Sequence, residues 1–361
     1  TSLDPKEIET IPILFGEQDV MKTLQLTPGI KGAGEGNSGF FVRGGGADQN
    51  LILLDESIVY NASHLLGFFS VFNSDALQGV SLYKSGIPAE YGGRASSVMD
   101  VKMREGNNKK FNLSGGIGLI SSRLTLEGPI VKDKGAFIIS GRRSYADLFL
   151  TFADDPVLQN TTLYFYDLNA KANYKISDKD RIFISGYFGR DDFKLGDQFG
   201  FDWGNATGTV RWNRVINDKL FSNTSVIFSN FDYQVSIGGE EDGFGISSNI
   251  RDWNLKQDFT YYLNSNNTFK FGLSGIHHTF LPGRLESADD IGFNEIELDN
   301  RYAVEIGAYI QNEQKIGNRF SLLYGFRYSG FNYMGEGTAF DLDDDGNVTG
   351  SQDYDSWESI K

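Results

Sequence analysis

The 361-residue sequence contains 33 Lys and Arg against 48 Asp and Glu, which gives a formal net charge of -15. This charge argues against a nucleic-acid partner, because phosphate binding needs clustered Lys and Arg. The absence of Cys excludes disulfides, thiolate metal sites and cysteine nucleophiles. Aromatic residues make up 14%, and 43 Gly accompany only 7 Pro, a composition typical of a β protein with many turns.

No apolar run is long enough for a membrane-spanning helix, and the stretch 65–72 is interrupted by Gly67 and Ser70. A β-barrel can cross a bilayer without such a run, because only alternate residues of its strands face lipid. The sequence starts at Thr1 without Met and shows no signal peptide, so we expect a chain that is processed, partial, or both.

The first hundred residues combine a short helix with short apolar strands tied by glycines. Residues 1–26 are a lead-in, in which residues 17–26 are predicted to form a helix that ends before Pro28. Strands are predicted at 51–54, from Val80 onward and at 98–103, where apolar and polar positions alternate. Glycines between them mark positions of positive φ or of close backbone approach.

Four motifs follow one another in this region, and together they carry a resemblance. They are Leu26-Thr27-Pro28-Gly29; an arginine-glycine element (Arg43, Gly44, Gly45) running into a strand that ends at Asp55; Asn73-Ser74-Asp75-Ala76; and Glu90-Tyr91-Gly92-Gly93-Arg94. In this order they resemble the plug domain of TonB-dependent outer-membrane transporters, in the branch that carries a carboxypeptidase-regulatory-like domain ahead of the plug. The box through which this family contacts TonB is not recognisable here.

From Phe111 onward, strand-like segments recur and their connections alternate between short and long. Short connections are predicted at 131–134, 177–180, 217–219, 264–267 and 317–319, and long ones at about 145–163, 191–202, 232–249, 282–301 and 334–356. Short turns on one side and long loops on the other are the pattern of an outer-membrane barrel. Residues 267–274, 303–311 and 321–329 alternate between apolar and polar or small side chains, as a lipid face and a hydrated lumen require.

The predicted fold is an all-β transmembrane β-barrel with an N-terminal α+β plug domain. Residues 1–107 are assigned to the plug, and residues 108–361 to the N-terminal part of the barrel, with about ten strands and a further strand starting near Trp357. The resemblance implies twenty-two strands. Ten strands would leave two open edges in lipid, at several kcal/mol per unpaired backbone group, so we expect the remaining strands to lie outside this sequence. An intact mass near 40 kDa for the native protein would contradict this expectation.

The candidate site residues are turns and contacts between plug and barrel. A plug inside a barrel meets a polar wall, and Arg is suited to bidentate pairing with wall carboxylates. Direct ligand contact is the alternative role for the arginines. The residues are Arg43, Gly44, Gly45, Asp55, Tyr91, Gly92, Gly93, Arg94, Arg142 and Arg143.

Three further motifs give weaker indications of a functional site. Residues 34–39 fit G-x-G-x-x-G, but a proline-glycine turn precedes them and a strand follows, so we interpret them as a turn rather than a nucleotide site. Asp341, Asp343 and Asp345 match the first half of a calcium loop whose closing acid is absent, and a solvated acidic loop is the alternative. His277 and His278 are adjacent and point to opposite faces of a strand, so they cannot chelate one metal. No catalytic constellation or resident cofactor is predicted.

The resemblance implies TonB-dependent import of a siderophore, vitamin, glycan or peptide across the bacterial outer membrane. The expected partners are the TonB-ExbB-ExbD complex, outer-membrane lipid, the unknown ligand and, for a nutrient importer, a surface lipoprotein lid. Two alternatives stay open: a plugged barrel that serves as a scaffold in a secretion or motility complex, and a soluble β-rich glycan-binding protein or hydrolase.

Overall fold

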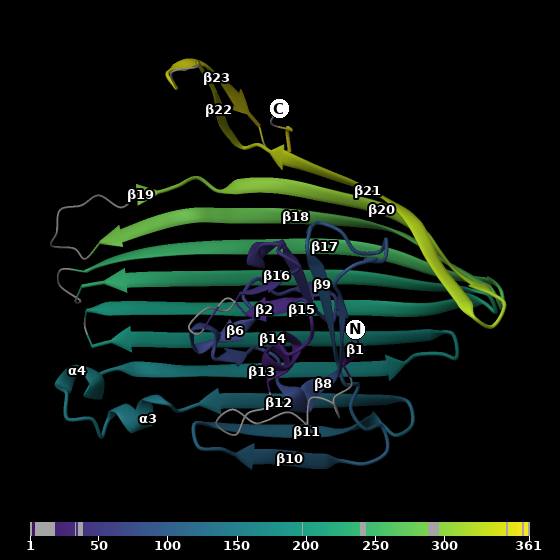
Figure 1. The fold of residues 1–361 in the computed structure, drawn as a ribbon, viewed down its shortest axis with the longest axis horizontal. Helices are drawn as coiled ribbons and strands as arrows, with labels where there is room; N and C mark the ends of the chain where they lie inside the picture. Colours follow the sequence, from purple (N-terminus) through teal and green to yellow (C-terminus); the bar gives the residue numbers. More distant parts are fainter. Residues whose placement is uncertain are drawn as a thin grey trace.

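The chain consists of an N-terminal part that we call the plug, whose last strand is Ser97–Met103, and a large curved sheet that we call the wall, whose first strand is Asn112–Ile117. The structure is a computed structural model, and it describes residues 2–3, 19–32, 34, 39–196, 198–238, 243–287, 296–343, 346–355 and 357–359. The plug lies against the middle of one face of the wall (Figure 1), where the strand Ser57–Ile58 contacts two wall strands.

The plug is built on a five-stranded sheet in the order β1-β8-β9-β4-β5. Strand β4 runs parallel to β9, and the other pairs are antiparallel. The strands are β1 Ser2–Leu3, β4 Asn50–Leu54, β5 Ser57–Ile58, β8 Leu77–Tyr83 and β9 Ser97–Met103, with two small hairpins, β2 Ile30–Gly32 with β3 Phe40–Val42 and β6 Ser63–His64 with β7 Phe69–Ser70. Strands were therefore predicted in the right places at 51–54 and 98–103, whereas the strand predicted from Val80 onward begins three residues earlier, at Leu77, and ends at Tyr83.

Among the described residues of the plug, the helical segments are α2 Val20–Gln25 and three short 3-10 turns, Ala47–Gln49, Leu65–Gly67 and Ser74–Ala76. Asp19 caps α2 by accepting the backbone N–H of Lys22, which confirms a short helix before Pro28. Val20, Leu24, Phe72, Met99 and Val101 are among the side chains that form the plug core, each at most 1% exposed. Burial of these apolar groups holds the plug together.

The wall runs antiparallel in chain order through eleven strands, close to the ten predicted. They are β10 Asn112–Ile117, β11 Ser121–Val131, β12 Gly135–Ser144, β13 Thr162–Lys175, β14 Asp180–Leu195, β15 Phe199–Asn217, β16 Leu220–Ile237, β17 Phe244–Asn264, β18 Asn267–Ser287, β20 Arg301–Ile316 and β21 Phe320–Met334, with β19 Ile296–Glu297 pairing beside β18. The strand predicted near Trp357 is an isolated bridge between Met334 and Ser359.

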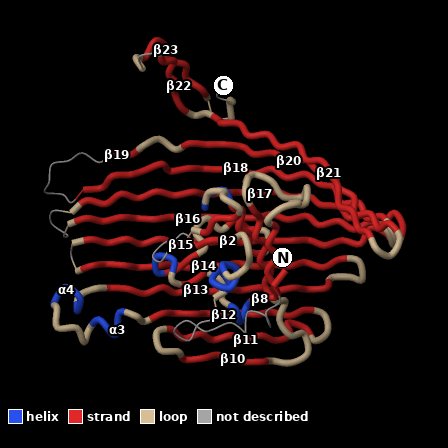
Figure 2. Tube along the Cα trace, viewed as in Figure 1, coloured by secondary structure: helices blue, strands red, loops and turns tan. Residues whose placement is uncertain are grey.

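The five short turns lie where they were predicted, at one end of the wall. The other end differs from the prediction. Strand β14 continues to Leu195 and β15 begins at Phe199, so both extend into the loop expected at 191–202. Strands β16 and β17 likewise extend into the loop expected at 232–249. Beyond the bilayer both faces of a strand meet water, so alternation is lost while the backbone ladder continues. Helices α3 Asp147–Leu150 and α4 Pro156–Gln159 occupy the connection after β12, and a hairpin of β22 Gly337–Leu342 and β23 Val348–Tyr354 follows β21 (Figure 2).

The wall has an apolar face turned away from the plug. Leu273, Ile310 and Phe326 are 63%, 51% and 69% exposed on it, while Gln311 on the opposite face is 4% exposed. This confirms the alternation predicted for β18, β20 and β21. Among the described residues, no helix is long and apolar enough to cross a membrane.

A charge on the apolar face should be costly. Leu273 lies six residues after the start of β18 at Asn267, near the middle of an apolar band about 25 Å tall. We expect Leu273→Arg to destabilise the protein by about 2–4 kcal/mol in a bilayer, and Leu273→Phe to change little. Urea unfolding in phospholipid vesicles measures both, and equal midpoints for the two variants would contradict a lipid-facing Leu273.

Candidate functional site

The plug and wall meet mainly through ion pairs and hydrogen bonds. Apolar contacts join them at two places, where Leu65 and Phe69 of the plug pack on Phe165 of the wall and where Tyr187 of the wall packs in the plug core. The ion pairs across the interface are Asp55–Lys171, Glu56–Arg211, His64–Asp167, His64–Asp191, Asp75–Arg123, Glu90–Lys270, Arg104–Glu127 and Glu105–Arg181. A wall whose outer face takes the apolar residues leaves polar residues for this contact.

The turn between β4 and β5 carries two acids into the wall. Asp55 and Glu56 both have positive φ, 45° and 77°, which is uncommon for residues with a side chain. Lys171 Nζ lies 2.8 Å from Asp55 Oδ2 and donates to the Met103 carbonyl at 2.9 Å. Both charged side chains are less than a tenth exposed. The hydrogen bonds satisfy a buried pair that would otherwise be costly.

Glu56, the second residue of this turn, faces two other wall cations. Arg211 donates to Glu56 Oε1 at 3.0 Å. Burial raises the pKa of Glu56, but the Lys256 and Arg211 cations outweigh it and hold this pKa below its usual value. The turn is thus tied to strands β13, β15 and β17 by charge.

His64 is the centre of a second buried cluster. Its Nδ1 lies 2.6 Å from Asp191 Oδ2 and its Nε2 lies 3.3 Å from Asp167 Oδ2, and the imidazole is 1% exposed. The N–H of Leu65 donates to Asp191 Oδ1 at 2.6 Å. Arg142 donates to Asp167 at 2.6 Å and to the Ser70 carbonyl at 2.8 Å. With His64 protonated, two cations and two anions balance within the cluster.

The surroundings of His64 fix its orientation and its charge. The ring stacks on Phe165 with centroids 4.2 Å apart and planes 9° apart. Burial lowers the pKa of His64, but Asp191 and Asp167 more than reverse this effect and raise the pKa above its usual value. The charged form of His64 therefore belongs to the folded plug.

The Glu90–Arg94 segment lies against the last strands of the wall. Glu90 pairs with Lys270 at 3.1 Å, and the Ala89 N–H donates to Gln311 Oε1 at 2.7 Å. A Cβ on Gly92 would lie 2.2 Å from Arg327 Nε, so glycine is needed for this close approach. Within the plug, the Tyr91 hydroxyl donates to Asp100 at 3.1 Å.

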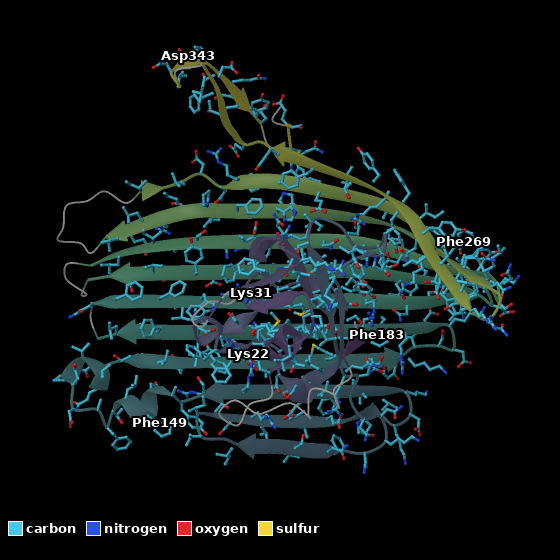
Figure 3. All side chains as sticks on the ribbon, in the orientation of Figure 1. Lys22, Lys31, Phe149, Phe183, Phe269 and Asp343 are labelled. Carbon is cyan, nitrogen blue, oxygen red and sulfur yellow. The ribbon has the colours of Figure 1, made fainter. Side chains whose placement is uncertain are left out.

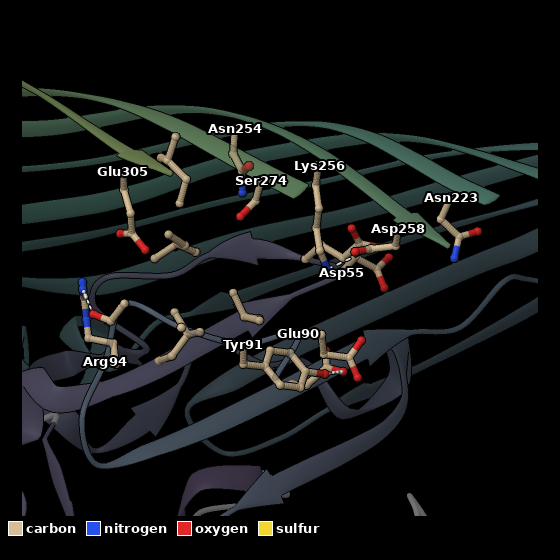
Figure 4. Close-up of a pocket in the computed structure, with 18 of the residues that line it drawn as sticks. Asp55, Glu90, Tyr91, Arg94, Asn223, Asn254, Lys256, Asp258, Ser274 and Glu305 are labelled. Carbon is tan, nitrogen blue, oxygen red and sulfur yellow. Dashed lines mark hydrogen bonds and ion pairs between the residues drawn. The ribbon is translucent and has the colours of Figure 1, made fainter. Parts of the chain in front are cut away.

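Two cavities lie between plug and wall. The inner cavity, of about 260 Å³, is lined by acids and cations of both parts, among them Glu56, Asp100, Lys256, Asp258 and Arg211 (Figure 4). The outer cavity, of about 490 Å³, lies nearer the long-connection end of the wall and includes Tyr60, Phe280 and Phe331. The two share Gly93, Arg94, His278 and Glu305.

Residues 2–98 match the model of the TonB-dependent Receptor Plug Domain. This part of the chain therefore belongs to the plug-domain family of the TonB-dependent receptors. No protein with a curated description matches its sequence.

Solved structures share the fold. They include the copper transporter OprC (TM-score 0.71, 11% identity, covering 98% of this chain and 57% of that one). A mutant of the ferric enterobactin receptor PfeA from Pseudomonas aeruginosa gives a TM-score of 0.67 at 13% identity, covering 92% of this chain and 58% of that one. The outer-membrane transporter YddB from Escherichia coli gives a TM-score of 0.65 at 15% identity, covering 92% of this chain and 56% of that one. The chain thus spans under three fifths of each of these structures, and the receptor is an outer-membrane protein.

The predicted site residues of the receptor have different surroundings. Asp55, Arg142 and the segment from Tyr91 to Gly93 lie in the plug–wall contact. Arg43, Gly44 and Gly45 form the turn after β3, where Arg43 is exposed with φ 50°. The Gly45 Cβ position is 2.4 Å from Ser96 Oγ, so this turn packs within the plug rather than on the wall.

Arg143 was wrongly predicted to contact the plug. It follows Arg142 on β12, so it points to the opposite face, where it is exposed and lies over the Tyr164 ring at 5.3 Å. Arg94 was expected to pair with a wall carboxylate. In the described part of the receptor its guanidinium instead donates to the Gly93 carbonyl at 2.9 Å and is exposed.

Sequence reasoning missed His64, Glu56, Lys171 and Asp191 as contact residues. His64 and Asp191 are 127 residues apart, so no local pattern links them. A signal existed for Lys171: with Asp167 it is one of two charged residues among the buried inward positions of β13, and it is 5% exposed.

The acidic hairpin stays an open prediction. Asp343, at the tip of β22–β23 and far from the plug (Figure 3), accepts the backbone N–H of Asn347 at 2.8 Å. Asp345 lies outside the described residues. Within the described residues no group of three His, Cys, Asp or Glu could hold a metal, and the calcium interpretation is untested.

His277 and His278 do face opposite sides, His277 beside Trp357 and His278 beside Asp252.

Breaking the buried Asp55–Lys171 pair should be costly. We expect Lys171→Met alone to destabilise the protein by about 3–5 kcal/mol, because Asp55 is left buried without a counter-charge. The double variant with Asp55→Asn should recover part of this loss. Thermal unfolding of the two single variants and the double variant forms a cycle, and additive losses would show that the pair is not coupled.

The His64 cluster predicts a pH dependence. A raised pKa in the folded state means that protonated His64 stabilises folding fully below its unfolded pKa, about 6.5, and that this contribution is lost as pH rises through the raised value. The stability advantage of the parent over His64→Gln should therefore shrink from pH 6 towards alkaline pH. His277→Gln, on the outer face, should show no such trend; a constant difference for His64→Gln would rule out the charged cluster.

Proposed function

We propose that the receptor imports a scarce nutrient across the outer membrane, with the plug gating the barrel and the TonB-ExbB-ExbD complex supplying the energy. The observation that carries this proposal is the polar contact between plug and wall. Ion pairs such as Asp55–Lys171 and Glu90–Lys270 hold the plug, beside a cavity lined by charged side chains of both parts.

Such a contact suits a plug that must move. Separating two apolar surfaces costs free energy in proportion to the area exposed to water. Polar groups that separate next to a wet cavity can exchange each lost partner for water, which is nearly as good enthalpically. The inner cavity touches Glu56, Glu90 and Lys270, so water has access to the contacts that must open.

The fold comparisons support the same proposal. The solved structures of similar fold include a ferric enterobactin receptor and a copper transporter. Siderophores, vitamins, glycans and peptides are the candidate ligand classes for this receptor, because fold does not fix ligand. A surface lipoprotein is a further candidate partner.

Locking the plug to the wall tests import. Ser57 Oγ of the plug lies 2.9 Å from Thr209 Oγ1 of β15, and the sequence has no Cys, so Ser57→Cys with Thr209→Cys creates a single possible disulfide. We expect cells with the locked receptor to stop depleting at least one component of a limiting medium. Mass spectrometry of the medium measures this depletion. A mild reductant should restore depletion, because it frees the plug.

The matched controls are the two single cysteine variants, which should deplete the medium as the parent does. If the lock forms in the outer membrane and no component of the medium is spared, the import proposal fails. In that case a plugged barrel that serves as a scaffold would be the better explanation.

A further inference from the structure

The outer cavity has the size and the mixed lining of a ligand site. Its volume of about 490 Å³ falls within the range of small-molecule sites, about 300–1,000 Å³. The plug contributes Tyr60, Gly93 and Arg94, and the wall contributes aromatic, aliphatic and polar groups from four strands. The wall residues are Ile250, His278, Phe280, Glu305, Ser329, Gly330 and Phe331.

The charges in this lining are few and separate. Among the described residues that line this cavity, Arg94 is the one permanent cation and Glu305 is the one carboxylate. Both lie beside Gly93, since the Arg94 guanidinium donates to the Gly93 carbonyl at 2.9 Å and a Cβ on Gly93 would be 3.0 Å from Glu305 Oε1. In Figure 4 the two side chains lie at the same end of the inner cavity, and no ion pair within 4 Å joins these two residues.

His278 adds a buried group that lacks a hydrogen bond. Its side chain is 8% exposed, and its Nδ1 lies 2.8 Å from Asp252 Oδ1. In the neutral ring, donation from Nδ1–H leaves Nε2 as an acceptor. The His278 side chain lines both cavities, and its buried Nε2 has no hydrogen-bond partner and lies 4.0 Å from Glu305 Oε2. A buried polar atom of this kind is costly unless a ligand or water satisfies it.

Asp252 connects this histidine to the plug. The Tyr60 hydroxyl donates to Asp252 Oδ2 at 2.5 Å, while His278 holds the other oxygen. Burial and the Asp252 carboxylate raise the pKa of Tyr60 above its usual value, so its hydroxyl stays a donor. The acceptors on the wall are therefore positioned by a fixed network.

We propose that the outer cavity binds the carboxyl-terminal end of a short peptide with an apolar last residue, an inference that rests on the proposed import. The carboxylate would pair with Arg94. The apolar side chain would lie against Phe280 and Phe331, whose rings flank His278 at 5.6 and 6.3 Å. A backbone N–H group of the peptide would donate to Glu305.

Other ligand classes match this lining less well. A multiply charged phosphate or metal chelate would face the Glu305 carboxylate with only one cation to balance it. An uncharged sugar could stack on the aromatic rings but would leave Arg94 without an anion. A peptide end supplies one anion, several N–H donors and an apolar side chain together, and its contacts would bridge Tyr60 and Arg94 of the plug to the wall.

Binding of a defined peptide tests the assignment. The probe is Ala-Ala-Leu-Phe, compared with the same peptide amidated at its carboxyl end, titrated calorimetrically into the purified full-length receptor in mild detergent. We expect the free acid to bind the parent at least about tenfold more tightly than the amide, because only the acid forms a charged hydrogen bond. Arg94→Gln should abolish this preference by weakening binding of the acid alone.

Arg43→Gln is the matched control, since Arg43 is also an exposed plug arginine but lines neither cavity. It should keep the parental preference for the acid. Equal binding of acid and amide to the parent, no binding of either, or an unchanged preference in Arg94→Gln would overturn the assignment. Because this titration needs no energised membrane, its failure leaves the import proposal standing, whereas failure of the disulfide lock removes import without touching a peptide site.

Discussion

The polarity of the inner wall face is the constraint on which the rest of the structure depends. Lipid requires apolar side chains at every second position of a strand, so the lumen receives polar ones. A domain that fills this lumen cannot be held by an apolar core and must be held by charge and hydrogen bonding. Buried pairs such as Asp55–Lys171 and the His64 cluster follow from that requirement, since an unpaired charge there would be costly.

The Asp55–Glu56 turn keeps a strained backbone so that its two carboxylates can contact the wall. A two-residue hairpin turn with both φ values positive favours Asn and Gly, and each side chain placed there costs about 1–2 kcal/mol. Glycine would remove the strain but also the carboxylates that reach Lys171 and Arg211. The turn thus keeps a less favourable backbone in exchange for contacts with three wall strands, which makes it a specific anchor rather than a generic turn.

Local patterns in the sequence predict those features of the fold that depend on residues close together in the chain. The short turns, the alternation in β18 and β20 and the plug strands at 51–54 and 98–103 depend on neighbours in sequence, and these features were located correctly. Contacts between plug and wall depend on the rotation and height of one domain inside another, which no local pattern encodes. For that reason the pairing of His64 with Asp191 was missed, and Arg143 was placed on the wrong face although the neighbouring Arg142 was placed correctly.

Charge balance along the inner cavity explains how such an interface can be both specific and separable. Glu56, Glu90 and Asp258 face Arg211, Lys270 and Lys256, so the lumen around the plug carries little net field despite many charges. A small displacement of the plug exchanges one pair for another or for water, without exposing an uncompensated charge to low dielectric. The buried His64 cluster lacks this access to the cavities, so it, rather than the cavity-side pairs, sets the resistance of the plug to movement.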